Sequence, residues 1–468
     1  MPRIAIIGAG SVVFAQKLIS DILQRPGIRN PEFVLMDIDA DRLKLAEIMS
    51  KKTAEAMGVK VPIQTTTDRK VAIKNANYVI NSVQVGGYPS TKIDFEIPAR
   101  YGLKQTIADT IGIGGIFRGL RTYPVMKGIT EDIMEVGAKG CFLLNYSNPM
   151  AMNMLSVWNT GDIPGVGLCH SVQGTSKMLA GRAGVDFADV SYKCGGINHM
   201  AFFTELKYKG KDLYPILFQK LLADPGAMGE KVRFEMMKRT GYFVTESSEH
   251  QSEYVPYFIH HGEEVIKQYE IPINEYIRRC ESIIARWSAQ QKEFTNPNKK
   301  VEVGAISHEY GSEIINAMET GVPAVIYGNV PNKNLIDNVS LDAVVEVACL
   351  VDRSGLQPTH FGKLPTVLAG IVATNVNMQL ATIEAAVQGS RELVYHAAML
   401  DPHTSATLTL DKIWAMCDEL FEAHKQHLPQ FAPVLKGTGR SLESLGETQA
   451  HVNVTTIGVP FVDGKKEI

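Results

Sequence analysis

Two short motifs carry side chains that bind transition metals. Residues 165–171 form an apolar run that ends in Cys169 and His170, and residues 195–200 contain His199. A cysteine thiolate and a histidine imidazole can hold Mn, Fe, Co, Ni or Zn. A closed structural zinc site needs four protein ligands, so Cys169 and His199 alone indicate an open metal site that water or substrate completes. The alternative is that both residues simply pack in the core.

A glycine-rich turn near the start of the chain has the spacing of a dinucleotide-binding turn. Gly8, Gly10 and Ser11 follow the apolar run of residues 3–7 and precede a predicted helix over residues 13–24. Glycines at such a turn let backbone N–H groups approach a pyrophosphate at the N-terminus of the helix. The third glycine of the GxGxxG pattern is replaced by valine, so a related domain that binds no dinucleotide is the alternative.

A second apolar run, residues 33–36, ends in Asp37. A carboxylate at this position accepts hydrogen bonds from a ribose diol and repels a 2′-phosphate. We therefore expect NAD rather than NADP as the dinucleotide. The nearby Arg42 is the residue that could reverse this preference.

Apolar runs alternate with helical stretches over the first part of the chain. This alternation predicts an α/β fold with a Rossmann-like, doubly wound parallel sheet, in which ligands bind beyond the carboxyl ends of the strands. The metal motif and the glycine turn would then share one edge of the sheet, and a glycine-rich loop over residues 108–115 could fold over that edge. Further predicted strands are 61–64, 78–83, 141–146 and 165–169, and further predicted helices are 40–57 and 123–137.

The pattern changes to α+β after about residue 190. We expect a NAD-binding Rossmann-like domain over residues 1–190, an α+β catalytic and oligomerisation domain over residues 191–430, and a C-terminal tail or arm over residues 431–468. The longest predicted helix, 366–398, is apolar on more than one face, which fits burial in the core or between lobes or subunits. Other elements predicted here are strands 202–208 and 322–327 and helices 225–239, 273–292 and 410–424.

The overall composition is that of a globular protein with a small partner. There are 47 Lys and Arg against 50 Asp and Glu, a net charge of -3, and no basic run that would favour nucleic acid. The chain starts without a signal-like segment and has no run of 18 apolar residues, so we expect a cytoplasmic protein that does not contact membranes. Its six cysteines lack CxxC spacing and are expected to be free thiols.

From residue 4 to about residue 427 the chain resembles glycoside hydrolase family 4, a family of NAD- and divalent-metal-dependent glycosidases. Within that family it is most similar to the bacterial α-galactosidases. The motifs that carry the resemblance lie at residues 8–11, 35–39, 105–110, 167–175, 196–201, 241–250 and 327–330.

The resemblance implies an enzyme that hydrolyses a glycosidic bond without consuming its NAD. The sugar would be oxidised at C3 and lose the C2 proton and the aglycone by elimination. It would then add water and be reduced again, with retention of configuration. Mn²⁺ or another divalent transition metal would assist the proton removal. By the same resemblance, Cys169 and His199 correspond to the family's metal ligands, and Asn148 to its substrate-binding asparagine.

The resemblance leaves the acid and the base less defined. Family members that act on phosphorylated sugars have a proton-donating aspartate directly after the metal-binding cysteine, where this chain has His170. We therefore expect Asp109 to donate the proton, with His170 as the alternative because its ordinary pKa suits transfer near neutral pH. Tyr254 corresponds to the family's catalytic base and needs a nearby cation to act at neutral pH. Glu246 is the alternative base.

One position bears on the substrate. By analogy with relatives that hydrolyse 6-phosphorylated sugars, their phosphate-binding arginine falls at Thr91, with Lys92 adjacent. A phosphate without such a partner would be costly to desolvate. We therefore expect the substrate to be a small, neutral, unphosphorylated α-galactoside such as melibiose, with an α-glucoside or an α-galacturonide left open. We also expect a homodimer or homotetramer. The alternatives from other classes are a NAD-dependent hydroxy-acid-type dehydrogenase and a catalytically silent sensor.

Overall fold

The computed structural model describes residues 1–298, 300–432 and 439. Within these residues, thirteen strands form one sheet, eleven of them in the order β10-β8-β7-β12-β11-β6-β5-β4-β1-β2-β3, while β13 pairs with β12 and β9 with β8. The first six strands run parallel, and β11 joins them by pairing antiparallel to β6. Strands β7 to β13 pair antiparallel, so the sheet is parallel at one end and antiparallel at the other.

The parallel half confirms the predicted Rossmann-like sheet. All of its strands except the edge strand β3 are short apolar runs that are mostly buried, as parallel strands covered by helices must be. The strands are β1 (Arg3–Ile7), β2 (Glu32–Met36), β3 (Ile63–Thr66), β4 (Tyr78–Asn81), β5 (Phe142–Asn145) and β6 (Gly165–Leu168). The strands of the other half are β7 (Val190–Ile197), β8 (Met200–Tyr208), β9 (Lys211–Asp212), β10 (Phe243–Val244), β11 (Ala324–Pro331), β12 (Val344–Asp352) and β13 (Gly355–Pro358).

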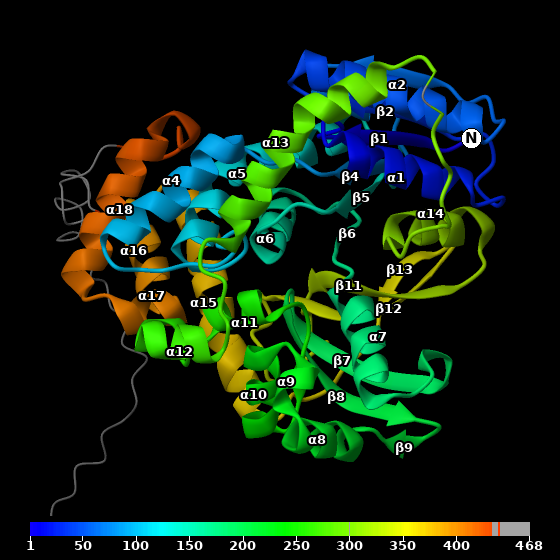
Figure 1. Cartoon of the computed structure of the whole chain (residues 1–468). Helices are drawn as coiled ribbons and strands as arrows, with labels where there is room; N and C mark the ends of the chain where they lie inside the picture. The colour runs from blue at the N-terminus through cyan, green and yellow to red at the C-terminus, as the bar shows by residue number, and fades with distance from the viewer. Residues whose placement is uncertain (299, 433–438, 440–468) are drawn as a thin grey trace, which may run out of the picture.

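Helices pack around both halves of the sheet (Figure 1). Helix α13 runs from the helices on the left of that view towards α2 at the upper right (Figure 1). The helices before β7 are α1 (Val12–Leu23), α2 (Ala40–Ala56), α3 (Arg69–Ile73), α4 (Gly87–Arg100), α5 (Gly112–Val136), α6 (Met150–Thr160) and α7 (Ser171–Ala183). The later helices are α8 (Tyr214–Ala223), α9 (Pro225–Met228), α10 (Lys231–Thr240), α11 (Ser248–Tyr254), α12 (Glu263–Gln268), α13 (Glu275–Thr295), α14 (Tyr310–Thr320), α15 (Thr366–Gln388), α16 (Arg391–Leu400), α17 (Pro402–Thr407) and α18 (Leu410–His424).

The prediction of a glycine-rich loop over residues 108–115 is wrong for the second half of that segment. Helix α5 begins at Gly112, eleven residues before the predicted start of the 123–137 helix. The glycines serve close packing, because a Cβ on Gly114 would lie 2.6 Å from the carbonyl oxygen of Ala108 and one on Gly115 2.6 Å from the carbonyl carbon of Thr110. The chain therefore forms the start of a buried helix where the glycine content alone predicted a loop over the edge of the sheet.

Two helices predicted as continuous are each broken in two. The predicted 366–398 helix divides into α15 and α16 at Gly389, whose φ of +65° ends the first helix, while Ser390 caps the second. The predicted 225–239 helix divides into α9 and α10 at Gly229 and Glu230, both with positive φ. In each case a left-handed residue interrupts an otherwise helical sequence pattern.

Helix α15 is the described helix that is long and apolar enough to cross a membrane, with a hydropathy of 1.3 over its most apolar window. Half of that window is buried in the fold. The helix packs against α5, α6, α16 and β7, so it contacts elements on both sides of the predicted boundary at residue 190. The expected tail over residues 431–468 falls almost entirely outside the described residues.

Candidate active site

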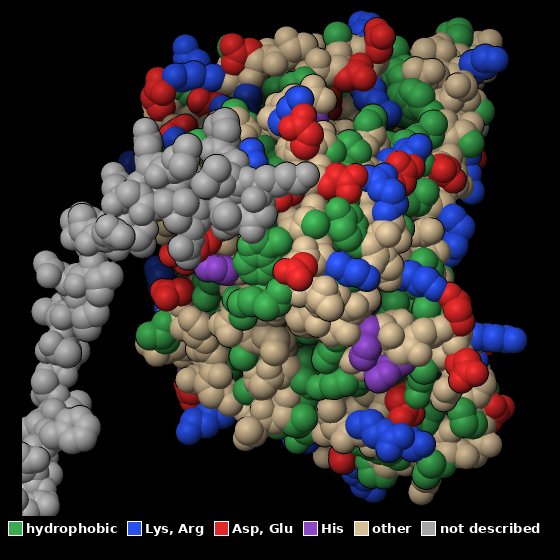
Figure 2. Space-filling model, turned by 90° about the vertical axis from the view of Figure 1, so that its left-hand side faces the viewer, with side chains coloured by type: hydrophobic (Ala, Val, Ile, Leu, Met, Phe, Trp, Pro, Cys, Tyr) green, Lys and Arg blue, Asp and Glu red, His purple; other side chains and the backbone are tan. Residues whose placement is uncertain are grey.

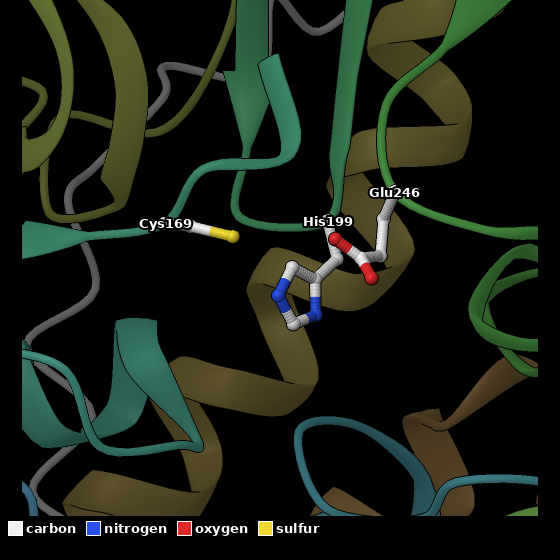
Figure 3. Close-up of side chains that lie close together, drawn as sticks. All are labelled: Cys169, His199 and Glu246. Atoms are coloured by element: carbon white, nitrogen blue, oxygen red, sulfur yellow. The ribbon is translucent and has the colours of Figure 1, made fainter. Parts of the chain in front are cut away.

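Three side chains from separate segments converge beyond the end of β6. Cys169 follows β6, His199 lies in the turn between β7 and β8, and Glu246 follows β10 (Figure 3). Their potential ligand atoms all lie within 4.8 Å of one another, and this is the group of metal-binding side chains found among the described residues. The structure thus brings together the two residues that the sequence motifs predicted as ligands, and adds a carboxylate.

The local backbone explains how Glu246 reaches this position. Strand β10 pairs with β8, and Thr245 continues this pairing. The N–H of Thr245 donates to the carbonyl oxygen of Ala201 at 2.8 Å, and its hydroxyl accepts from the N–H of Ala201 at 3.1 Å. His199 and Glu246 both take positive φ, +62° and +68°. Non-glycine residues rarely adopt this conformation, and such strain is found at functional sites.

The electrostatics of the three side chains suit a cation. Burial lowers the pKa of His199 to about 4, so its imidazole is neutral and able to bind a metal. Burial, reinforced by the charges of Glu246 and Glu346, holds the pKa of the Cys169 thiol well above its usual range, so a thiolate needs a positive partner. Burial opposes ionisation of Glu246, but the neighbouring His199 and His250 outweigh it and lower its pKa.

The donor set therefore fits a divalent transition metal. Nδ1 of His199 is buried without a hydrogen-bond partner, which leaves it free to act as a ligand. One thiolate, one imidazole and one carboxylate make three protein ligands, and three ligands leave positions open for substrate.

The glycine turn lies at the carboxyl end of β1, beside the end of β2. The N–H groups of Gly8 and Ala9 both donate to the carbonyl oxygen of Met36 at 2.9 Å. Gly8 has φ +87°, and a Cβ there would lie 2.8 Å from the backbone of Ser82, so the turn requires glycine. Ser11 is exposed directly before α1, with no capping hydrogen bond from its side chain. The turn thus leaves the N-terminus of α1 open to a ligand.

Asp37 lies directly after β2, and its side chain contacts the glycine turn. Its Oδ2 accepts a hydrogen bond from the N–H of Gly10 at 2.7 Å, and a Cβ on Gly10 would lie 2.5 Å from the same oxygen. The guanidinium of Arg42 lies 4.5 Å from the ring centre of Trp287 and 3.7 Å from a carboxylate oxygen of Asp39. The Arg42 guanidinium also donates to the carbonyl oxygen of Gly10 at 3.4 Å, so Arg42 contacts the glycine turn itself as well as Trp287 and Asp39.

Asp109 and Asn148 lie beside each other, with the Asn148 amide 3.4 Å from Oδ2 of Asp109. The hydroxyl of Thr110 donates to the other oxygen of Asp109 at 2.7 Å. Although burial favours the neutral acid, the Arg118 guanidinium, two nearby histidines and the Thr110 hydrogen bond together outweigh it and lower the pKa of Asp109. The carboxyl group is therefore ionised at neutral pH, which suits a hydrogen-bond acceptor better than the predicted proton donor.

Tyr254 and His170 occupy contrasting environments. The Tyr254 hydroxyl is fully buried without a hydrogen-bond partner, and burial first, then the charge of Asp109, raises its pKa well above the usual range. A role as base therefore depends on an adjacent cation, as the sequence predicted. The His170 side chain is 67% exposed and lies 3.8 Å from Glu309, so it is open to solvent, from which it can exchange protons.

Sequence reasoning missed two buried charged residues near the site, Glu346 and Arg118, and it missed the position of the partly buried Glu246 beside Cys169 and His199. Glu246 was considered as a base but not as a metal ligand, because its segment had no spacing that pointed to Cys169. Glu346 lies among apolar residues within β12, whose other acid is its last residue, and burial together with the charge of Glu246 raises its pKa to about 8. An acid among the apolar residues of a strand was the signal that could have found it. Arg118 lay in a stretch whose helix began earlier than predicted.

The fold and the side chains together define an α/β protein with a dinucleotide-type glycine turn and a transition-metal donor set at neighbouring strand ends. The chain belongs to family 4 of the glycosyl hydrolases. The model described as "Family 4 glycosyl hydrolase" matches residues 3–185, and the one described as "Family 4 glycosyl hydrolase C-terminal domain" matches residues 194–404. The resemblance expected from the motifs is thus confirmed, and membership of a hydrolase family argues against the dehydrogenase alternative.

Similar proteins include two bacterial enzymes named α-galactosidase. The one from Bacillus subtilis (strain 168) is 47% identical over 92% of this chain and 100% of its own length. The one from Rhizobium meliloti (strain 1021) is 34% identical over 92% of this chain and 90% of its own length.

Solved structures of similar fold include the putative glucosidase lplD from Bacillus subtilis, with a TM-score of 0.79, 25% identity and coverage of 90% of this chain and 99% of that one. A 6-phospho-alpha-glucosidase from gut microorganisms, solved in complex with NAD and Mn²⁺, has a TM-score of 0.77, 20% identity and coverage of 92% and 100%.

Proposed function

We propose that this protein hydrolyses unphosphorylated α-galactosides, using NAD and Mn²⁺ as cofactors. The observation that carries the proposal is the placement of the Cys169, His199 and Glu246 donor set beyond β6, on the sheet whose β1 and β2 ends hold the glycine turn. Two relatives of 47% and 34% identity named α-galactosidase support the substrate class.

Each cofactor has a set of residues to hold it. Cys169, His199 and Glu246 would bind the cation, and the turn at Gly8 and Gly10 with Asp37 would bind the dinucleotide. When bound, the dinucleotide accepts and returns a hydride, and the metal acts as a Lewis acid at the neighbouring sugar carbons.

The remaining residues would act on the sugar itself. The buried Tyr254 hydroxyl would take the proton from C2, because it has no hydrogen-bond partner and interacts electrostatically with Glu246 and Cys169 of the donor set. Asn148 and the ionised Asp109 would hold sugar hydroxyls by donating and accepting hydrogen bonds. The exposed His170 would then supply the proton to the departing aglycone.

The predicted lack of a phosphate partner is supported by the surroundings of Thr91. Its side chain is buried, donates to the carbonyl oxygen of Gly87 (3.1 Å) and accepts from Gln84 (3.2 Å). The adjacent Lys92 is engaged with Glu96 one helical turn along. Neither side chain offers a free cation for a sugar phosphate.

An α-galacturonide is the second candidate substrate. The observation that favours it is Arg118, a buried cation whose Nε donates to the carbonyl oxygen of Asn148 at 3.2 Å. Relatives named α-galacturonidase are 27% identical, below the two α-galactosidases.

The test is a panel of p-nitrophenyl glycosides assayed with NAD, Mn²⁺ and a reductant, then with each omitted. We expect release from the α-galactoside, loss of release without either cofactor, and no net NADH. Comparing kcat/KM for p-nitrophenyl α-galactoside with its 6-phosphate tests the substrate class. A tenfold preference for the phosphate, or for the α-galacturonide, would refute it.

Positive and negative side chains are interspersed on the face of the molecule in Figure 2, which fits a small neutral partner rather than a polyanion.

We further propose that the protein is a cytoplasmic homodimer or homotetramer. Sedimentation velocity at micromolar concentration gives the oligomeric state, and a single monomer boundary would refute the assembly.

A further inference from the structure

The carboxylate of Glu253 binds three consecutive backbone N–H groups. Glu253 lies in α11, buried to 3% exposure. Its Oε1 accepts from the N–H of Thr106 (2.6 Å) and Ile107 (3.2 Å), and its Oε2 accepts from the N–H of Ala108 (3.1 Å). The Thr106 hydroxyl also donates to the carbonyl oxygen of Glu249 at 2.8 Å, so the segment over residues 106–108 is fastened to α11 at several points.

This segment holds an unfavourable backbone conformation. Ala108 has φ +48°, in the left-handed region that alanine rarely adopts. Consecutive N–H groups that converge on one point form a concave site for an anion. Burial raises the pKa of Glu253 to about 7, but the three N–H groups donate to both of its oxygens and so favour the carboxylate as the anion in this site. Asp109 is the next residue along the chain.

We propose that Glu253 is a positioning residue, which holds Ala108 in its left-handed conformation and thereby sets the Asp109 carboxylate against the Asn148 amide. The inference deepens the proposed function, because it rests on Asp109 holding the sugar. The neighbouring Tyr254 is the candidate base, so two consecutive residues of α11 would act on the site, one directly and one through Asp109.

Glu253→Gln tests the proposal through the asymmetry of the three hydrogen bonds. The glutamine oxygen can still accept from Thr106 and Ile107, but its NH₂ group then faces the N–H of Ala108, and two donors repel. We expect kcat/KM for the α-galactoside to fall at least tenfold, with the Kd values for Mn²⁺ and NAD within twofold of the wild type.

Glu249→Gln is the matched control. Glu249 lies on the same helix, and its side chain reaches Arg279 at 3.5 Å, while its contact with Thr106 is through the backbone. The same loss of charge there should leave kcat/KM within twofold. A tenfold loss in both variants would mean that the charge of α11 matters and not the clamp, which would overturn the proposal.

Two combined variants separate positioning from a general structural role. If Glu253 acts through Asp109, then Asp109→Asn with Glu253→Gln should be no more than twofold worse than Asp109→Asn alone. Because glycine adopts positive φ readily, adding Ala108→Gly to Glu253→Gln should raise kcat/KM at least threefold above that of Glu253→Gln alone. The proposal would be overturned if the losses in kcat/KM of Asp109→Asn and Glu253→Gln multiply in the double variant, or if Ala108→Gly gives no rescue. If Glu253→Gln is insoluble, Glu253→Asp replaces it, since its shorter side chain cannot reach all three N–H groups, and wild-type kcat/KM there would also overturn it.

Hydrogen exchange measured by mass spectrometry distinguishes this inference from the proposed function. In Glu253→Gln, the amides of residues 106–108 should exchange at least tenfold faster than in wild type or Glu249→Gln, whatever the enzyme's substrate. Fast exchange without any α-galactosidase activity in the wild type would refute the proposed function alone. Unchanged exchange would refute the clamp alone.

Discussion

Replacing Asp94 of α4 with asparagine should destabilise the protein far more than breaking an exposed ion pair made by the same helix. Asp94 in α4 accepts two hydrogen bonds from Arg121 of α5 (3.0 and 2.5 Å) and lies 2.9 Å from Nε2 of His424 in α18. The three side chains are at most 3% exposed. The Arg121 guanidinium also donates to the carbonyl oxygen of Val85, on the loop after β4.

The expected size of the effect follows from this burial. Removing one partner of a buried ion pair leaves an uncompensated charge and costs about 3–5 kcal/mol. Unfolding entropy of about 2.1 cal/mol/K per residue amounts to roughly 1 kcal/mol/K for this chain if it unfolds as one unit. Asp94→Asn should therefore lower Tm by about 3–5 °C, and by more if part of the chain unfolds separately.

The matched control is Arg100→Gln. Arg100 in α4 pairs with Glu419 in α18, with side-chain exposures of 57% and 40%. An exposed pair contributes about 0.2–1 kcal/mol, so Tm should change by less than about 1 °C. Both variants are measured by differential scanning calorimetry at one scan rate. If Asp94→Asn lowers Tm no more than Arg100→Gln, the buried cluster does not stabilise the fold as argued.

Three further predictions concern the metal, the dinucleotide and pH. Cys169→Ser should lower Mn²⁺ affinity at least tenfold and abolish turnover, since a hydroxyl does not ionise as a thiol does; calorimetric titration that gives wild-type affinity would end the assignment. Gly10→Ala should weaken NAD binding at least tenfold, because its Cβ would displace the Asp37 carboxylate, and fluorescence titration measures this. Glu346 has a pKa raised from 4.5 to about 8 by burial, so the unfolded chain ionises it at lower pH than the folded protein. Stability from this group is therefore present below about pH 4.5 and declines as pH rises towards 8, and Glu346→Gln should remove that decline in Tm measured in EDTA.

The parallel half of the fold and its glycine turn were predictable because all of its strands except the polar edge strand β3 are continuous apolar runs. Period and length identify such runs, and the glycine turn and Asp37 follow them directly in sequence. Cys169 and His199 were likewise marked by their own motifs. Each of these signals is local, so no knowledge of distant contacts was needed.

What the sequence could not supply depends on contacts between distant segments. The position of Glu246 follows from the pairing of β10 with β8, and the lowered pKa of Asp109 from Arg118 in the helix that follows. The early start of α5 at Gly112 depends on close packing against Ala108, which composition cannot distinguish from a loop.

The continuous sheet limits how this protein can move. Gly328 and Asn329 of β11 pair with Leu168 and Gly167 of β6, so strands from late in the chain complete the edge of the early parallel half. A hinge between the two stretches matched by the family models would have to break main-chain ladders within one sheet. We therefore expect side chains and surface segments, and not a hinge in the sheet, to move when substrate enters or product leaves. The ends of β6, β7 and β8 should then hold Cys169 and His199, the proposed metal ligands, at a fixed spacing.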